Sequence, residues 1–346
     1  MSAREPAGLP FVRVTRGPLV ESVHAIAACA TDAGGRVALS YGDVDTPVFL
    51  RSAAKPFIAA AIVASGAADR YEFTARELAV VCASHDGEPF HVEAVLSILA
   101  KIGRDRSALQ CGTHPPSYEP AAAALAAAGE APSALHNNCS GKHAGILAMC
   151  AHRGVDDARY LEADHPVQRE ILAFCARVVG EEPAALVLGI DGCGIPVFAT
   201  TLRRAARAFA RFATLEDVAP ADAAALAAVR DAMTAEPAYV GGTARFDTAL
   251  IRESGGRVVG KAGAEGVHGD ALRAAGLGLA LKVIDGSRRA MPPAAVALLR
   301  ELGALDAGEA ERLKSFGSPE VRNVAGRIVG ETLAGSPDTI RGARTS

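Results

Sequence analysis

The sequence predicts an α+β fold, in which an antiparallel sheet is flanked by helices and carries a large helical insert. Two observations predict it. β-like runs separated by turn residues occupy about residues 11–50 and 240–290, toward the two ends of the chain. Between them, over about residues 53–235, apolar residues recur three and four positions apart, as they do in amphipathic helices. Because no linker of flexible composition interrupts the 346 residues, we expect a single domain spanning 1–346.

The segment Val23–Leu50 is predicted to form a hairpin and a third strand. The run HAIAACA is followed by the turn-rich TDAGG, and then by RVALSYG and TPVFL. Two further β-like pieces, Arg257–Lys261 and Leu277–Val283, complete the sheet from the other end. Helices are expected from Pro292 onward, before a polar tail that starts at about Ser336.

The helical insert contains segments with recognisable end signals. Thr74 and Glu77 have the spacing of a capping box, so a helix begins there and runs through LAVVCAS. Ser84 then falls at or just past the end of this helix. The other predicted helices are Pro89–Ile102, Ser140–Arg153, His165–Val179 and Pro220–Met233.

Composition limits the class of partner and the compartment. A formal net charge of -3, with both signs interspersed, gives no basic surface for nucleic acid or for an anionic membrane. The N-terminus has no apolar stretch of signal-peptide length, and no later stretch is long and apolar enough to span a bilayer. The 7 cysteines are odd in number and scattered, which suits a reducing compartment. We therefore expect a cytoplasmic protein that acts on a small molecule.

The first candidate site is the run Arg51-Ser52-Ala53-Ala54-Lys55, directly after a predicted strand. Three residues are about one helical turn, so the Lys55 amine can reach the Ser52 hydroxyl and act as its general base. A neutral lysine needs a lowered pKa, which burial or a neighbouring cation such as Arg51 would supply. The same spacing also occurs often on solvated helices, and Pro56 restricts Lys55 to the first turn of a helix.

Four further clusters combine polar residues with glycine. Ser84 and His85 lie in CASHDGEPFH after the predicted helix, although a plain helix end would look similar. HNNCSGKHAG leads into the Ser140 helix and could present N–H groups to a carboxylate or an oxyanion. GIDGCGIP, which contains Asp191, and GKAGAEG, which contains Lys261, place small residues around charged ones at strand ends, although plain tight turns would look similar.

Taken together, RSAAKP, CASHDGEPFH, HNNCSGKHAG, GIDGCGIPVFA and GKAGAEG resemble the signature of the bacterial L-asparaginase II family, typified by rhizobial inducible asparaginase. The resemblance extends from about Pro18 to the final helices. It implies a fold similar to the serine β-lactamases and penicillin-binding enzymes, and a homodimer. The activity that it implies is hydrolysis of L-asparagine to L-aspartate and ammonia.

The resemblance also implies roles for individual residues. Two Ser/Lys pairs are expected, Ser52 with Lys55 and Ser84 with Lys261. A zinc ion is expected between two cysteines and a lysine, which map to Cys139, Lys142 and Cys193. The implied substrate-binding residues are Asn138 and Asp191 for the amino and amide groups, with Arg51 or His85 near the carboxylate.

Several alternatives remain open at this stage. Ser84 could exchange roles with Ser52 as the group that is acylated. A zinc-bound water could attack the amide in place of a serine. A β-lactam or another amide could be the substrate, since fold alone does not define function. A non-catalytic amino-acid-binding protein would keep the pocket without turnover.

Overall fold

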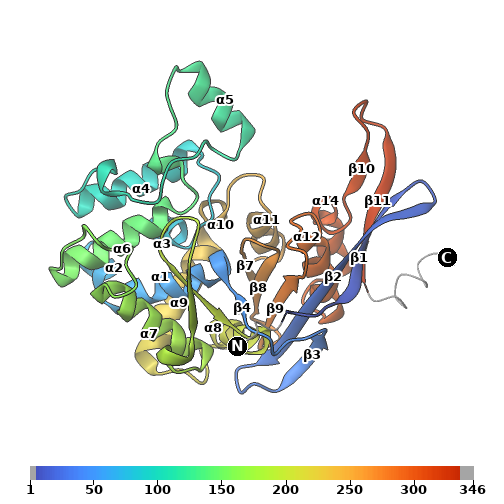
Figure 1. Cartoon of the computed structure of the whole chain (residues 1–346), viewed down its shortest axis with the longest axis horizontal. Coiled ribbons are helices and arrows are strands. Elements are labelled where there is room, and N and C mark those ends of the chain that lie inside the picture. Colours follow the sequence, from blue (N-terminus) through green and yellow to red (C-terminus); the bar gives the residue numbers. More distant parts are fainter. Residues whose placement is uncertain (1–4, 336–346) are drawn as a thin grey trace. The chain divides into compact units, whose positions relative to one another are not determined.

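The structure is a computed structural model that describes residues 5–335 (Figure 1). The chain divides into two compact units. The first, here the sheet unit, contains the chain up to Ala53, the segment Thr200–Thr214 and the chain from Glu253 onward. The second, here the helical unit, contains Ala54–Ala199 and Leu215–Arg252. Each unit therefore combines segments that lie far apart in the sequence.

The sheet unit is built on an antiparallel sheet of 8 strands, with the order β10-β11-β1-β2-β9-β8-β7 and β3 beside β2. The strands of this unit are β1 (Leu9–Arg16), β2 (Leu19–Asp32), β3 (Val37–Tyr41), β4 (Val48–Phe49), β7 (Val258–Ala262), β8 (Val267–Leu272), β9 (Leu277–Val283), β10 (Glu320–Arg322) and β11 (Ile328–Ala334). Its helices are α8 (Leu202–Thr214), α12 (Met291–Glu301), α13 (Ala307–Arg312) and α14 (Lys314–Gly317).

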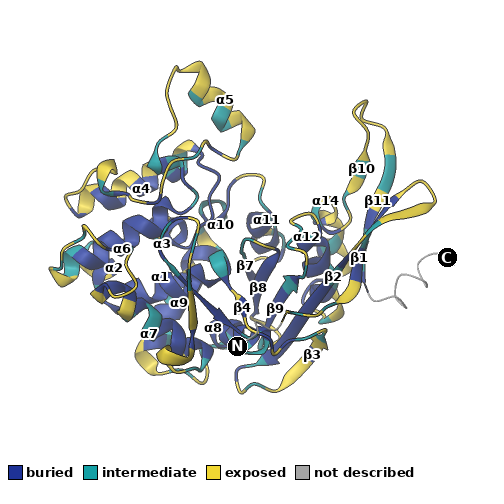
Figure 2. Cartoon of the chain, viewed as in Figure 1, coloured by how far each residue is buried: buried dark blue, intermediate teal, exposed yellow. Residues whose placement is uncertain are grey.

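The centre of this sheet is buried because apolar residues follow one another along β2 and β9. The stretch from Ile26 to Ala30 in β2 is inaccessible to solvent, and it pairs with β9. Helix α8 packs on β2, β8 and β9. A Cβ at Gly278 would collide with the backbone of Ala206 in α8, so glycine is needed there for the helix to approach the strand. Figure 2 shows the contrast between the buried centre and the exposed ends of the β1–β2 and β10–β11 hairpins.

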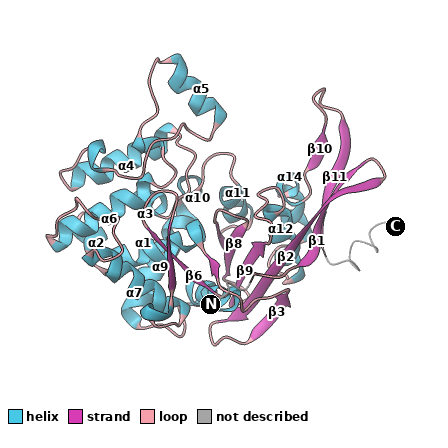
Figure 3. Ribbon diagram, viewed as in Figure 1, coloured by secondary structure: helices cyan, strands magenta, loops and turns pink. Residues whose placement is uncertain are grey.

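The helical unit contains most of the helices of the chain (Figure 3). They are α1 (Lys55–Ala64), α2 (Ala67–Arg70), α3 (Ala75–Val81), α4 (Pro89–Lys101), α5 (Glu119–Ala127), α6 (Ser140–Arg153), α7 (Pro166–Val179), α9 (Pro220–Ala235), α10 (Pro237–Val240) and α11 (Phe246–Glu253). Short 3-10 helices are η1 (Arg51–Ala54), which leads into α1, and η2 (Arg106–Ala108), η3 (Ala134–His136) and η4 (Pro183–Ala185). An antiparallel pair, β5 (Val187–Ile190) and β6 (Pro196–Thr200), also lies largely in this unit.

Helices α1 and α6 form the centre of the helical unit. From Lys55 to Ile62 every residue of α1 is buried, and so is every residue of α6 from Ser140 to Cys150. Helix α1 packs against α6, α7 and α9, and α3 packs against α4, α6 and α9. Helix α1 begins at Lys55, so Pro56 occupies the first turn, where its missing N–H costs nothing. Lys55 and the residues at the start of α6 thus lie in the buried centre of this unit.

Several predicted elements are confirmed. The structure combines helices with an antiparallel sheet, as expected. Helix α6 and strand β9 have the predicted bounds, and α4 and α7 differ from the prediction by one residue. Thr74 and Glu77 form the predicted capping box at the start of α3, and Ser84 lies just past its end.

Other predictions were wrong in detail. The predicted third strand is reduced to the two residues of β4, which is not part of the large sheet. The insert predicted as helical also contains the β5–β6 pair, and its segment α8 belongs to the sheet unit. Strand β8 was missed because its VHGDAL sequence contains turn-forming residues, and β10 and β11 extend the sheet beyond residue 290. The predicted polar tail lies outside the described residues.

No helix within residues 5–335 is long and apolar enough to cross a membrane.

Candidate active site

The Lys55 amine lies at the centre of the candidate site in the helical unit. Its Nζ lies 3.1 Å from Oγ of Ser84 and 3.3 Å from the carbonyl oxygen of Asn138, and it also donates to the carbonyl of Ala83. Lys55 and Ser84 are 1% and 5% exposed. These four residues come from the start of α1, the end of the α3 segment and the loop before α6. Tertiary packing therefore brings Ser84 to Lys55, 29 residues away in the sequence.

The polar groups around Lys55 accommodate both protonation states of its amine. A neutral amine has two N–H groups and one lone pair, and the carbonyls of Ala83 and Asn138 accept from the former. The Ser84 hydroxyl can then donate to the lone pair. A protonated amine has a third N–H, which can donate to Ser84 or to the sulfur of Cys139. An arrangement that satisfies both forms suits a group that takes a proton from a serine and returns it.

His85 is buried and both of its ring nitrogens have hydrogen-bond partners. The N–H of Gly87 donates to Nδ1 at 3.1 Å, so Nε2 carries the proton and donates to Oγ of Ser140 at 2.8 Å. Burial, followed by the positive charges nearby, lowers the pKa of His85 well below its usual value. The side chain is 0% exposed. His85 is thus a neutral link between the Ser84 loop and α6, and it has no free N–H for the substrate carboxylate.

Asn138 contributes its backbone to the site. Its carbonyl accepts from Lys55 and from the N–H of His85, at 3.3 Å in each case. Its own N–H donates to Nε2 of His114 at 2.9 Å. The peptide before α6 therefore has hydrogen bonds at both its N–H and its carbonyl. Through the carbonyl it connects the Lys55 amine to the loop that carries Ser84.

A loop that the sequence analysis did not identify supports the Ser84 segment from the other side. Val240 accepts a backbone hydrogen bond from Ser84, and Thr243 donates from both its N–H and its hydroxyl to the Glu88 carboxylate at 2.7 Å. Arg245 lies 3.3 Å from the Asp86 carboxylate and 3.4 Å from the Ser84 carbonyl. The signal in the sequence was VGGTAR, a glycine pair followed by an arginine.

The two glycines of that loop are required by close contacts. A Cβ at Gly242, whose φ is +139°, would lie 2.8 Å from a carboxylate oxygen of Glu88 and 2.9 Å from one of Asp86. A Cβ at Gly241 would lie 2.8 Å from that of Arg245. The acidic residues of CASHDGEPFH therefore anchor a loop, which explains why this cluster is so polar.

The three residues implied as zinc ligands lie together in the helical unit. Lys142 Nζ donates to Cys193 Sγ at 3.1 Å, and Cys193 in turn hydrogen-bonds Cys139. Lys142 is 1% exposed, and the two cysteines are 5% and 6% exposed. Cys139 is the residue before α6 and Lys142 lies in its first turn, while Cys193 lies in the β5–β6 turn. Packing thus joins two cysteines whose separation in sequence gave no indication of a site.

Hydrogen bonding, burial and charge act together on the protonation of Cys139, Cys193 and Lys142. The hydrogen bond from Cys193, reinforced against burial by the positive charges of Lys142 and Lys55, holds the pKa of Cys139 well below its usual value. The same hydrogen bond and burial raise the pKa of Cys193. Burial lowers the pKa of Lys142, but the charges of Cys139, Cys193 and Asp191 outweigh it and raise the pKa on balance.

The donor set is chemically suited to zinc. Thiolate sulfurs are ligands that zinc favours, and a deprotonated lysine amine would supply a nitrogen donor beside them. Among the described residues, no group of three or more His, Cys, Asp and Glu side chains could hold a metal ion. The set depends on a lysine as its third ligand.

Asp191 lies in the turn that also carries Cys193. Its carboxylate accepts from the N–H of Gly192 at 2.8 Å, and its backbone bonds Ile195 and Gly194 at 2.9 Å. Gly194 has a φ of 91°, which confirms the predicted tight turn. Asp191 is near enough to Lys142 to raise its pKa, so it shares the electrostatic environment of the two cysteines.

The remaining predicted residues belong to the sheet unit. Ser52 lies in η1, preceded by Arg51, which has a φ of 51° in the left-handed region. Such strain in a residue other than glycine is concentrated at functional sites. Lys261 is 0% exposed, lies in β7 opposite Gly269 and donates to the carbonyl of Ala262 at 2.7 Å.

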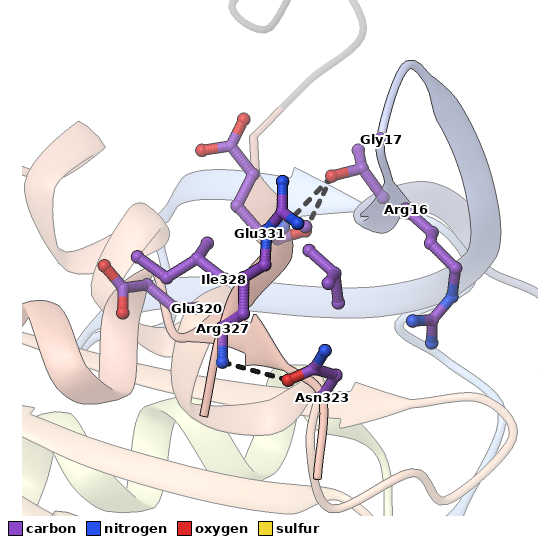
Figure 4. Close-up of a pocket in the computed structure, with 10 residues that line it drawn as sticks. Arg16, Gly17, Glu320, Asn323, Arg327, Ile328 and Glu331 are labelled. Atoms are coloured by element: carbon purple, nitrogen blue, oxygen red, sulfur yellow. Dashed lines mark hydrogen bonds between the residues drawn. The ribbon is translucent and has the colours of Figure 1, made fainter. Parts of the chain in front are cut away.

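A pocket of about 780 Å³ in the sheet unit contains none of the predicted site residues. It is lined by the ends of the β1–β2 and β10–β11 hairpins, including Arg16, Asn323, Arg327 and Glu331 (Figure 4). Hydrogen bonds within the hairpins occupy much of its polar lining, such as that from the N–H of Arg327 to Asn323 at 2.9 Å. This pocket is therefore not the candidate active site.

Comparison with protein families decides the class of enzyme. Residues 12–334 match the L-asparaginase II family. The chain belongs to the L-asparaginase II family. The matched range extends over both units, and the match confirms the resemblance that the five motifs indicated. As a family member the chain is an amide hydrolase of the L-asparaginase type. No curated protein sequence matches the chain closely enough to name as a relative.

Proposed function

We propose that this member of the L-asparaginase II family hydrolyses L-asparagine to L-aspartate and ammonia through a Ser-Lys nucleophile. The observation that supports the proposal best is the buried hydrogen bond between Lys55 Nζ and Ser84 Oγ, at 3.1 Å. This pair favours Ser84 as the attacking group, with Ser52 as the alternative. The second proposed lysine, Lys261, would then act with the other serine.

In the proposed mechanism, Ser84 transfers its proton to Lys55 as its Oγ bonds to the side-chain amide carbon of asparagine. Backbone N–H groups stabilise the tetrahedral oxyanion. Lys55 returns the proton to the leaving nitrogen as the C–N bond breaks, which releases ammonia and leaves an aspartyl ester on the serine. A water molecule then attacks the ester carbon as Lys55 takes its proton. Lys55 returns this proton to Oγ of Ser84 as the C–O bond to the serine breaks, and L-aspartate leaves.

The experiment that tests this proposal is an ammonia-release assay combined with mapping of the acyl group. The parent protein should release ammonia from L-asparagine, and rapid quenching followed by peptide mass spectrometry should find an aspartyl ester on Ser84. An ester on Ser52 would reverse the assignment of the serines. Turnover without any ester in the parent or in either Ser→Ala variant would favour attack by water at a metal.

We propose further that Cys139, Lys142 and Cys193 hold zinc. The buried sulfur and nitrogen donors and the low pKa of Cys139 support this assignment. When bound, zinc would supply positive charge that fixes the β5–β6 turn against the start of α6. Lys142 must lose its proton to bind, and Asp191 on the same turn would be positioned to meet the amino group of the substrate.

Three broader proposals follow from the family resemblance. The antiparallel sheet combined with a helical insertion supports a relationship to the serine β-lactamases and penicillin-binding enzymes, whose Ser-x-x-Lys sequence is matched by Ser52 and Lys55. A chromogenic cephalosporin assay tests whether the protein also hydrolyses β-lactams. We also propose that the protein is cytoplasmic. We propose further that it forms a homodimer, and light scattering would measure its molar mass in solution.

A further inference from the structure

We propose that Arg245 binds the α-carboxylate of the amino-acid substrate. The inference rests on the proposed function, because it assumes that Ser84 and Lys55 act on the side-chain amide of a free amino acid. Such a substrate carries a carboxylate close to the reacting carbon, so the site needs a cation placed near Ser84. The sequence analysis expected Arg51 or His85 in this role.

His85 is excluded by its hydrogen bonds. Its Nδ1 accepts from Gly87 and its Nε2 donates to Ser140, so a substrate oxygen finds no N–H there. Its ring is 0% exposed and neutral. A carboxylate placed beside it would be desolvated without a compensating hydrogen bond or charge, which is strongly unfavourable.

The two buried lysines of the helical unit already have other partners. Lys55 donates to Ala83, Ser84 and Asn138, and Lys142 donates to Cys193. Both side chains are 1% exposed. These two amines serve the serine and the thiol groups, so within the helical unit the carboxylate needs a third cation.

Arg245 has the position and the accessibility that this role requires. Its Nη2 lies 3.4 Å from the backbone carbonyl oxygen of Ser84, the residue whose side chain is the proposed nucleophile. In asparagine the carboxylate carbon lies roughly 4 Å from the amide carbon that is attacked, which is three covalent bonds. The proposal therefore requires the guanidinium group to lie within about this distance of the carbon that Ser84 attacks.

The guanidinium group also has donors available. It has five N–H donors, of which the contacts with Ser84 and Asp86 engage two. The side chain is 28% exposed, whereas Asp86 is 6% exposed. Asp86 thus orients Arg245 from the protein side and leaves its outer edge for a bidentate contact with a planar carboxylate.

The loop that carries Arg245 is held in place at several points. Thr243 bonds Glu88 through two groups, and the N–H of Gly242 donates to the Thr248 hydroxyl at 3.3 Å. A Cβ at Gly241 would collide with the Arg245 side chain. Fixing an arginine in this way lowers the entropy that it loses when it binds a ligand.

The test compares two ligands that differ only in the α-carboxylate, L-aspartate and β-alanine, in calorimetric titrations of the parent and of Arg245→Met. Removing the guanidinium should weaken L-aspartate binding by roughly 30- to 1,000-fold and change β-alanine binding by less than about threefold. Arg245→Lys, which keeps the charge but not the planar fork, should give an intermediate loss for L-aspartate. Arg153→Met, which removes an exposed arginine paired with Glu170, is the matched control and should change neither.

The outcomes separate this inference from the proposed function. If Arg245→Met lost the same fraction of its affinity for L-aspartate and for β-alanine, the residue would only hold the Ser84 loop. That result would overturn the proposal. So would a parent protein that binds L-aspartate no better than β-alanine. Because binding is measured without turnover, a parent that binds L-aspartate through Arg245 but releases no ammonia would refute only the proposed function.

Discussion

Lys55 Nζ donates to Ser84 Oγ across 3.1 Å, and this bond joins the first residue of α1 to the loop after α3. If Lys55 is the general base, Lys55→Met should lower kcat for asparagine by about 10²- to 10⁴-fold. Lys55→Arg should be equally inactive, because a guanidinium group keeps the positive charge but cannot be deprotonated. Ammonia release measures both, with circular dichroism to verify folding. Substantial activity in the arginine variant would rule out proton transfer by Lys55.

His85 should support turnover without binding the substrate. His85→Gln keeps a donor for Ser140 but loses the acceptor for Gly87, so we expect a fall in kcat of about tenfold with a KM within about threefold of the parent. Because the pKa of His85 lies well below its usual value, the pH profile of kcat/KM should have the same shape in both proteins near neutral pH. His152→Gln, outside the site, is the control. A large rise in KM alone would instead place His85 in contact with substrate.

Removal of Cys193 should abolish zinc binding. The parent purified without added metal should contain about one zinc per chain, and Cys193→Ala should contain almost none, since a single thiolate and an amine bind zinc weakly. Cys175→Ala removes another buried thiol and should leave the metal content unchanged. Retention should also fall as the pH is lowered, because protons compete for Cys139 and Lys142. Inductively coupled plasma mass spectrometry measures the zinc content. Equal zinc in Cys193→Ala and Cys175→Ala would reject the site.

Glu77 should make the stability of the protein depend on pH. Burial raises its pKa, but the hydrogen bonds from Lys101, Thr74 and Ser97 outweigh burial and lower the pKa on balance. A carboxylate with a lowered folded-state pKa contributes stability above its unfolded pKa of about 4.3, and the contribution disappears as the pH falls through the folded value. Glu77→Gln should therefore lower the free energy of unfolding by about 1–3 kcal/mol at pH 7, and by much less near pH 3.

Urea denaturation at the two pH values measures this difference. Glu93→Gln is the matched control, because Glu93 is an exposed glutamate on α4. It should change the free energy of unfolding by less than about 0.5 kcal/mol. A Glu77→Gln effect of equal size at both pH values would mean that packing, and not the charge, accounts for the loss.

Local patterns were sufficient where a segment carried its own end signals. Helix α3 was predicted from Thr74 and Glu77 because a capping box is a contact between neighbours in sequence. Strand β8 was not predicted because its sequence contains turn-forming residues, and the β10–β11 hairpin was not predicted because β11 joins the sheet by pairing with the distant strand β1. For α8, the periodicity of apolar residues predicts an apolar face, but it does not predict that this face packs on the sheet.

The site divides in the same way. The sequence alone provided the five motifs, and with them the family, because each motif is a contiguous run whose order along the chain can be read directly. Three features were decided only by tertiary structure. These are the partner of Lys55, the neutral state of His85 and the contact of Arg245 with the Ser84 carbonyl, each of which depends on contacts between segments more than twenty residues apart. Hydrogen bonding and burial act through space, so a serine three residues from a lysine was the obvious partner in sequence, while the serine bonded to Lys55 in the fold lies 29 residues away.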